Sequence, residues 1–203
     1  LLLTYKIKLS MVFKSNYISK DAKIGLNVKF GNFVEVFENV EIQDGSYIGS
    51  YSSIGGPAEH IDQPVDGLGN KVLIGRSTII REHVTINGGF TDQTKIGDNC
   101  YIMTKSHVGH DSLISNDVTI SPLAVVGGHS IIMESCNLGI ASVLHQYTKI
   151  NRLVMLGANS FAKGELEEGL VYVGNPAVPI KINSIGINRS NLDNAASKEL
   201  IKN

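Results

Sequence analysis

Large apolar side chains recur at every sixth position through most of this chain. One run holds this register from Ile18 to Ile54, a short second run spans 74–86, and the longest continues from Ile96 to Ala162. Only Ala162, the last member, is not a large aliphatic or aromatic residue. An α-helix, with its period of 3.6, would rotate these residues off any single face, and a strand with period two does not continue for so long.

A second column of small side chains lies two residues before the first and keeps the same period. In the longest run its members are Thr94, Cys100, Ser106, Ser112, Val118, Ala124, Ser130, Cys136, Ser142, Thr148, Val154 and Ser160. Each repeat of six therefore predicts one short flat strand and one tight corner. The large residue fills the interior, and the small residue fits where the chain turns.

Three such repeats close one turn of eighteen residues, and successive turns stack as parallel strands about 4.8 Å apart. The pattern predicts an all-β fold, a parallel β-helix that forms a triangular prism of about seven coils over residues 18–182. Parallel crossovers are right-handed in most folds, and periodicity alone does not set the hand of this coil.

Two interruptions break the register, and we expect them to leave the prism as loops at 55–73 and 87–95. Loops that break a regular scaffold often carry binding function. Residues 1–17 form an N-terminal segment, in which 1–10 are either native or an upstream remnant ahead of a start at Met11. The turn Gly174–Ala177 marks the exit from the coil. Residues 183–203 form a C-terminal tail, with a short helix expected within 188–203.

The composition excludes several classes of protein. A net charge of −1 gives no electrostatic basis for binding nucleic acid. No apolar run approaches the ~20 residues that span a bilayer, and no signal peptide is evident. The two cysteines, Cys100 and Cys136, lie two turns apart, which is too far for a disulfide. We therefore expect structural cysteines, a cytoplasmic location and no tightly bound cofactor.

Four histidines of the coil are candidates for chemistry, and His110 is the strongest. At eighteen residues a turn, Gly128 lies directly above His110 and leaves open space over its ring, beside His129. The next residue, Asp111, can reach the ring near a corner. An imidazole oriented by a carboxylate is the usual general base for a hydroxyl or amine, and a glycine N–H is a common donor to an oxyanion. The alternative is that these histidines only decorate the corners.

Several segments resemble one family of hexapeptide-repeat acyltransferases, the UDP-N-acetylglucosamine acyltransferases that begin lipid A synthesis. The similarity covers about residues 45–190 and includes the histidine spacing without gaps. The segments that carry it are Ile79–Asn87, Lys95–Asn99, Ser106–Asp111, Val126–His129 and Val143–Gln146. The resemblance implies a left-handed coil and a homotrimer with its active sites between neighbouring chains.

The resemblance also implies a reaction, in which acyl carrier protein thioester donates an acyl group to the 3-hydroxyl of a UDP-N-acetylglucosamine-type nucleotide sugar. His110 would be the general base, Asp111 its support and Gly128 the oxyanion donor. The residues implied to bind substrate are Asn87, His107, His129, His145 and Gln146 in the sugar and pantetheine cleft, and Asn183 and Arg189 at the nucleotide.

Two alternatives stay open. Gly174-Asn175-Pro176-Ala177 is a motif common in acetyl-CoA-dependent sugar acetyltransferases, and Ala158 would shorten an acyl channel. The chain would then be an O- or N-acetyltransferase for surface polysaccharide sugars, with coenzyme A as the donor's carrier. The other alternative is a zinc-binding, γ-carbonic-anhydrase-like or scaffold protein, its metal held by His107, His110 and His129 of two subunits. The expected site itself contains no metal.

Overall fold

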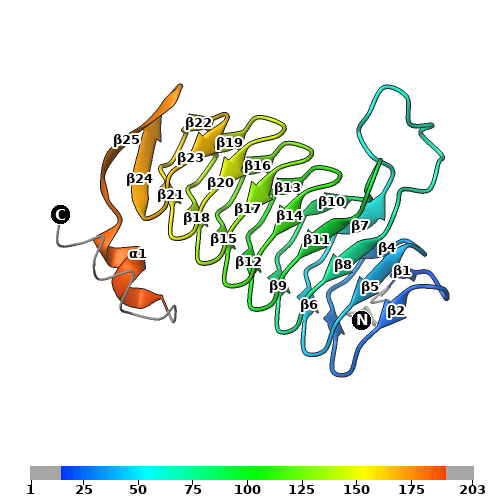
Figure 1. Cartoon of the computed structure of the whole chain (residues 1–203). Helices are drawn as coiled ribbons and strands as arrows, with labels where there is room; N and C mark the ends of the chain where they lie inside the picture. The colour runs from blue at the N-terminus through cyan, green and yellow to red at the C-terminus, as the bar shows by residue number, and fades with distance from the viewer. Residues whose placement is uncertain (1–14, 191–203) are drawn as a thin grey trace, which may run out of the picture.

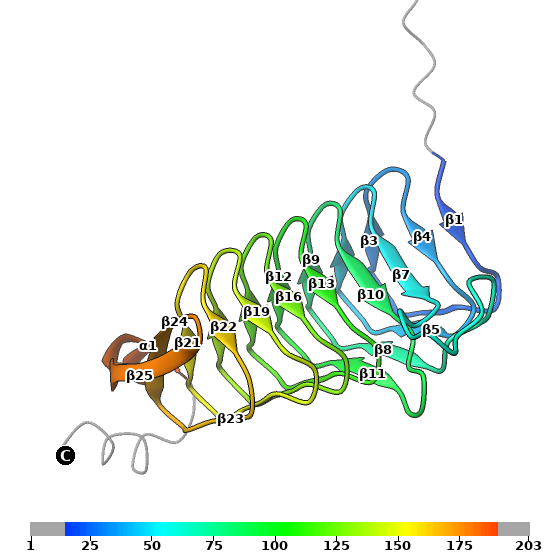
Figure 2. The same cartoon turned by 90° about the horizontal axis from the view of Figure 1, so that it is seen from above.

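The computed structural model of this chain describes residues 15–190, which form one elongated prism with three flat faces (Figure 1). The expectations for residues 1–10 and for a helix beyond 190 lie outside the described residues. Each face is a parallel sheet whose strands come from every third strand of the chain. Figure 2 shows the coils seen from above, stacked along the prism.

The strands are short because each spans only one side of a coil. Sheet A contains β1 (Tyr17–Ile18), β4 (Glu35–Val36), β7 (Ser53–Gly56), β10 (Thr85–Asn87), β13 (His107–Val108), β16 (Val125–Val126), β19 (Val143–Leu144) and β22 (Phe161–Ala162). Sheet B contains β2 (Lys23–Ile24), β5 (Val40–Ile42), β8 (Val72–Ile74), β11 (Thr94–Ile96), β14 (Leu113–Ile114), β17 (Ile131–Ile132), β20 (Lys149–Ile150) and β23 (Glu165–Leu166). Sheet C contains β3 (Lys29–Phe30), β6 (Tyr47–Ile48), β9 (Ile79–Ile80), β12 (Tyr101–Ile102), β15 (Thr119–Ile120), β18 (Asn137–Leu138), β21 (Met155–Leu156), β24 (Leu170–Gly174) and β25 (Ala177–Ile182).

The predicted prism is confirmed, but the count of about seven coils is one too low. Each sheet has eight parallel strands, so the prism has about eight coils. The last coil was missed because its register is shortened: Lys149 pairs with Glu165 and Ile150 with Leu166, a step of sixteen residues. Leu166 and Tyr172 are buried and continue the interior column beyond Ala162.

Both sequence columns occupy the positions predicted for them. The interior column is almost fully buried from Val36 to Leu166, and every small residue from Thr94 to Ser160 is at most 2% exposed. The residue just before the small one takes a positive φ at most corners, such as 54° at Asn99 and 65° at Leu123. This conformation is costly for side chains larger than glycine and is held here by the stacked coils on either side. Cys100 and Cys136 are buried free thiols, as expected.

Two segments leave the prism side by side, residues 57–71 between β7 and β8 and residues 88–93 between β10 and β11. The longer one projects from the upper right of the prism in Figure 1. They are tied together by an antiparallel bridge between Asn70 and Gly89. The side-chain amide of Asn39 donates to the carbonyls of Gly55, Gly69 and Asn70, which fixes both ends of the longer segment.

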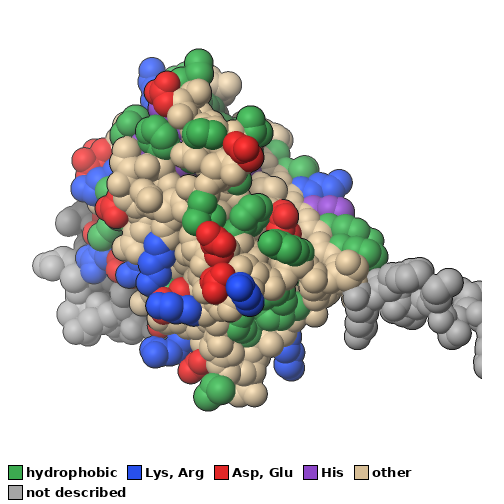
Figure 3. Space-filling model, turned by 90° about the vertical axis from the view of Figure 1, so that its right-hand side faces the viewer, with side chains coloured by type: hydrophobic (Ala, Val, Ile, Leu, Met, Phe, Trp, Pro, Cys, Tyr) green, Lys and Arg blue, Asp and Glu red, His purple; other side chains and the backbone are tan. Residues whose placement is uncertain are grey.

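The C-terminal end of the described chain departs from the parallel pattern. β25 turns back and pairs antiparallel with β24, and α1 (Ser184–Arg189) follows. The turn at Gly174–Ala177 joins the two strands, with Gly174 at a φ of 102°. Within residues 15–190, no helix is long and apolar enough to cross a membrane. In the face shown in Figure 3, acidic and basic side chains are interspersed rather than gathered into a block of one sign.

Candidate active site

The corner between sheets A and B carries a column of three chemically notable residues. Asp111, His129 and Tyr147 follow one another at intervals of eighteen, with φ values of 57°, 58° and 62°. Their side chains therefore leave successive coils at the same corner, one above the next. His110 immediately precedes the first of them, two residues after the end of β13.

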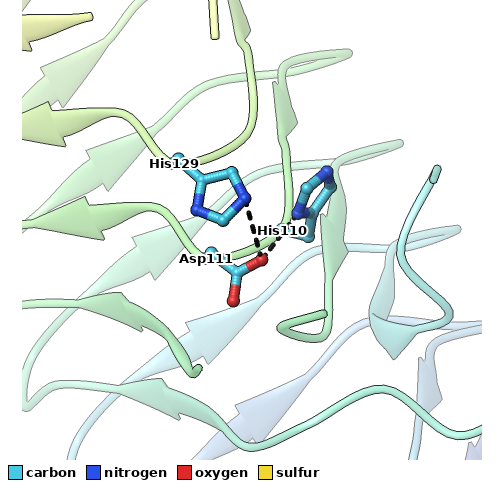
Figure 4. A group of neighbouring side chains, drawn as sticks. All are labelled: His110, Asp111 and His129. Carbon is cyan, nitrogen blue, oxygen red and sulfur yellow. Dashed lines mark hydrogen bonds and ion pairs between the residues drawn. The ribbon is translucent and has the colours of Figure 1, made fainter. Parts of the chain in front are cut away.

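His110 and Asp111 are directly hydrogen bonded, as predicted. Nδ1 of His110 lies 2.7 Å from Oδ2 of Asp111, and Nε2 of His129 lies 3.5 Å from the same oxygen (Figure 4). Although it lies at a corner, His110 is buried, with a side chain that is only 9% exposed. Residues from the two inserted segments cover it. Because these segments lie outside the six-residue repeat, their position over His110 could not be predicted from the sequence.

The Asp111 carboxylate is held by the backbone of the shorter inserted segment. Its oxygens accept hydrogen bonds from the N–H groups of Phe90, Thr91 and Asp92, at 2.6–3.0 Å. Burial acts to raise the pKa of Asp111, but the hydrogen bonds from His110 and from these three N–H groups outweigh it and lower the pKa to about 2. The carboxylate is therefore ionised at neutral pH and fixes Nδ1–H of His110 as the donor.

Gly128 lies against the His110 ring, and the ring itself occupies the space that was predicted to be open above it. A Cβ at Gly128 would lie 2.7 Å from Nε2 of His110 and 2.8 Å from its Cε1, closer than side-chain carbons approach. Within residues 15–190, the Gly128 N–H has no acceptor among the backbone or side-chain hydrogen bonds. Among the described residues, the glycine that packs on this ring therefore carries a backbone donor without a partner.

Two aromatic residues that the sequence reasoning missed, His60 and Phe90, close another side of His110. Their rings are stacked with centroids 4.1 Å apart, and each meets the His110 ring edge-on, at 5.9 and 6.2 Å. His60 belongs to the longer inserted segment and Phe90 to the shorter one. The only signal in the sequence was that these segments interrupt the repeat, which located the loops but not the side chains.

A cavity of about 550 Å³ adjoins this group beneath the longer segment. Asn87, His60 and Glu59 are among the residues that line it. The Asn87 amide nitrogen donates to the carbonyl of Pro57 at 2.6 Å, whereas its buried amide oxygen has no partner within the described chain. The cavity wall therefore includes a buried side-chain acceptor without a partner in the described part of the chain.

His107 lies on the strand that leads to His110. Its Nδ1 is 2.8 Å from the hydroxyl of Thr85 on the preceding coil. Burial lowers the pKa of His107, the carboxylate of Glu59 acts in the opposite direction, and His110 lowers the pKa further. His107 is therefore coupled to both His110 and the cavity-lining Glu59.

His129 is packed flat against Tyr147, with ring centroids 4.6 Å apart and planes 5° apart. His145 and Gln146 lie at the same corner, just before Tyr147, and are exposed. Nδ1 of His145 is 3.0 Å from the carbonyl oxygen of Gln146, and its ring meets Phe161 edge-on. These two residues continue the corner beyond His129 rather than touching His110.

Asn183 and Arg189 are not brought to this corner. Both line a cavity of about 560 Å³ beside sheet C and α1, together with Lys181. The Asn183 side chain caps α1, accepting from the N–H of Gly186, and donates to the carbonyl of Leu153. Its amide is thus already used within the fold, which sequence similarity alone did not reveal.

Comparisons with known proteins show which family this chain resembles. Residues 93–128, which contain His110 and Gly128, match the family model described as bacterial transferase hexapeptide (six repeats). An acyl-acyl-carrier-protein–UDP-N-acetylglucosamine O-acyltransferase from Campylobacter concisus is 30% identical over 92% of this chain and 71% of its own length. One from Burkholderia orbicola is 34% identical over 70% of this chain and 55% of its own length.

The fold has the same relatives. The solved UDP-N-acetylglucosamine acyltransferase from Campylobacter jejuni superposes with a TM-score of 0.82 at 31% identity, over 92% of this chain and 73% of that structure. This likeness establishes the hand of the coil, which is a left-handed parallel β-helix. The chain spans 55% to 71% of the length of the two curated relatives described above. By its similarity to the C. concisus enzyme over more than two thirds of that protein, the chain belongs to the family of acyl-carrier-protein-dependent UDP-N-acetylglucosamine O-acyltransferases.

Proposed function

We propose that this chain transfers an acyl group from acyl carrier protein thioester to a hydroxyl of a UDP-N-acetylglucosamine-type nucleotide sugar, with His110 as the general base. The observation that carries the proposal is the His110–Asp111 pair beneath Gly128. Asp111 holds Nδ1, so that the lone pair of Nε2 remains available, and this nitrogen lies against Gly128, which has no side chain to displace it. The named activity of the relatives supports the choice of donor and acceptor.

The reaction follows from this arrangement. Nε2 of His110 takes the proton of the sugar hydroxyl as its oxygen attacks the thioester carbonyl. The Gly128 N–H donates to the oxyanion that develops on the carbonyl oxygen. The C–S bond then breaks, and the protonated imidazole returns its proton to the leaving thiolate. Asp111, ionised throughout, stabilises the transient imidazolium.

We propose that a homotrimer completes the cleft. The strand positions that flank the corner point apolar side chains outward: Leu113 and Ile131 on sheet B are 38% and 37% exposed, and Val125 and Val143 on sheet A are each 37% exposed. Contiguous apolar surface beside a polar corner is typical of an interface between chains. Light scattering on the purified protein would give three times the mass of one chain, and a monomer would contradict this arrangement.

The cavity beside α1 is our candidate for the nucleotide. Arg189 and Lys181 supply positive charge for phosphates. We assign Asn183 the role of holding α1 and thereby the position of Arg189, because its side-chain amide is already hydrogen bonded. Arg189→Ala is expected to raise the KM for the nucleotide sugar more than it lowers kcat.

One alternative keeps the same base but changes the donor. The turn Gly174–Ala177, common in sugar acetyltransferases that use acetyl-CoA, forms the tip of the β24–β25 hairpin. The two donors are separated by mixing the purified protein with acyl carrier protein thioesters or acetyl-CoA, each with a panel of UDP-sugars, and following thiol release. Release that requires both acyl carrier protein thioester and UDP-N-acetylglucosamine supports the proposal. Release with acetyl-CoA only, or with neither donor, overturns it.

A further inference from the structure

We propose that His110, Asp111 and His129 form an inhibitory binding site for a zinc-class divalent metal ion. The three side chains offer two imidazole nitrogens and one carboxylate oxygen, all within 4.8 Å of one another. In Figure 4 both imidazole rings direct a nitrogen toward the same carboxylate. This donor set and its compactness suit Zn²⁺, and three protein ligands leave a fourth position for water.

The separations between the donor atoms are close to those that a metal needs. Zinc binds such donors at about 2.0–2.2 Å, so neighbouring donors of a tetrahedral site lie about 3.4 Å apart. Nε2 of His129 and Oδ2 of Asp111 are 3.5 Å apart. Nδ1 of His110 and the same oxygen are 2.7 Å apart because a proton joins them, and this pair must open by about 0.7 Å.

The supporting groups favour the same site. Three backbone N–H groups from Phe90, Thr91 and Asp92 orient the Asp111 carboxylate, as second-shell donors do for metal-ligating carboxylates. Stacking on Tyr147 fixes the plane of the His129 ring. The His129 side chain is 22% exposed, which gives an ion a route from solvent. The ligand set differs from the zinc alternative described above, since Asp111 replaces His107 and all three ligands belong to one chain.

Metal binding would inactivate the base through its tautomer. In the catalytic form Nδ1 carries the proton and Nε2 has the lone pair. A metal bond to Nδ1 requires that proton to leave, and in the neutral ring the proton is placed on Nε2. His110 then has no lone pair to accept the proton of the substrate. This consequence, unlike the binding itself, rests on the proposed function.

The experiment uses the full chain, freed of metal, and titrates it with Zn²⁺ by calorimetry and with Co²⁺ by visible absorption. We expect one ion per chain and an intense tetrahedral Co²⁺ spectrum. His129→Ala is expected to weaken Zn²⁺ binding at least tenfold. His83→Ala is the matched control, because His83 is also a corner histidine, with a φ of 59°, stacked on an aromatic ring at another corner.

Equal affinity in wild type and His129→Ala, with folding verified by circular dichroism, would overturn the proposed site, as would an equal loss in His83→Ala. Acyl transfer, measured separately, should fall on addition of Zn²⁺ and return with a chelator. Binding without inhibition would overturn the tautomer argument while leaving the site intact. A protein that binds zinc but transfers no acyl group from any donor would refute the proposed function and not the metal site.

Discussion

The corner between sheets A and B and the corner between sheets B and C repeat the same backbone turn but differ in role. The B–C corner links neighbouring coils, whereas the A–B corner carries the candidate active site. At the B–C corner, the N–H of Leu26 donates to the Asp44 side chain on the next coil, at 2.7 Å. The N–H groups of Arg76 and Asp98 likewise donate to Asp98 and Asn116, at 2.7 and 2.8 Å. At these positions, a short polar side chain of one coil accepts a hydrogen bond from the backbone of the coil before it.

At the A–B corner the same repeat position is occupied by His110 and Gly128. A glycine has no side chain to accept from the coil below, and His110 directs its ring under that glycine instead. This corner therefore lacks the structural hydrogen bond and holds in its place an imidazole ring and, within residues 15–190, a backbone N–H of Gly128 without an acceptor. The difference teaches that a repeat protein makes a site by omitting one element of its regular ladder, not by changing its backbone.

Among the substitutions that test the difference between the two corners, His110→Ala is expected to have the largest effect on turnover. General-base catalysis is worth about 10²–10⁴ in rate, so we expect kcat to fall by about 10³-fold. The fold should persist, because Asp111 keeps its three backbone donors. Turnover and the circular dichroism melting curve are the measurements. Undiminished turnover in a folded variant would end the proposed mechanism.

Gly128→Ala adds one methyl group at the point where the His110 ring packs against the backbone. Because a Cβ there would lie 2.7 Å from Nε2 of His110, the ring must move, and we expect turnover to fall by about 10²-fold. The displacement of the ring can be measured in the protein without substrate, because the NMR resonances of the His110 ring should shift. A variant with wild-type kcat would show that the absence of a side chain at Gly128 has no role in the reaction.

Asp111→Asn tests the site through the pH dependence of folding stability. A pKa lowered from 3.8 to about 2 means that ionised Asp111 stabilises the folded state by about 2 kcal/mol. Because the folded-state pKa is lowered, this contribution is complete above about pH 4 and is lost as the pH falls through about 2.

Denaturant unfolding at several pH values provides the test. The difference in unfolding free energy between wild type and Asp111→Asn should be largest at neutral pH and shrink toward pH 2. A difference that stays constant over this range would contradict the assigned pKa. The variant should also lose turnover, because a neutral amide does not stabilise an imidazolium.

The smallest effect is expected for Asn116→Ala, at the corner between sheets B and C. Losing the hydrogen bond to the Asp98 N–H should cost about 1 kcal/mol of stability or less and leave kcat unchanged. The variant serves as the control for the three substitutions above, because it alters an equivalent corner position. A loss of turnover comparable to that of Gly128→Ala would erase the distinction between the two corners.

The features that follow the repeat were predictable, and those that leave it were not. The period of six residues is enough to predict the buried columns and to place Gly128 above His110. The clamp of Phe90, Thr91 and Asp92 on Asp111 comes from a segment without periodicity, and so does the His60–Phe90 stack. The eighth coil escaped notice because a two-residue shortening moved Leu166 out of register.

The antiparallel strand β25 governs how coils of different copies can meet. Its partner β24 would otherwise present a free parallel edge to which the first rung of another molecule could add. The reversed chain direction of β25 interrupts the parallel register, and Pro179 lies within this last strand, where it has no N–H to donate. Sheet C is therefore protected at this end from the end-to-end growth that turns solenoids into filaments, while contacts along the sides of the prism stay open.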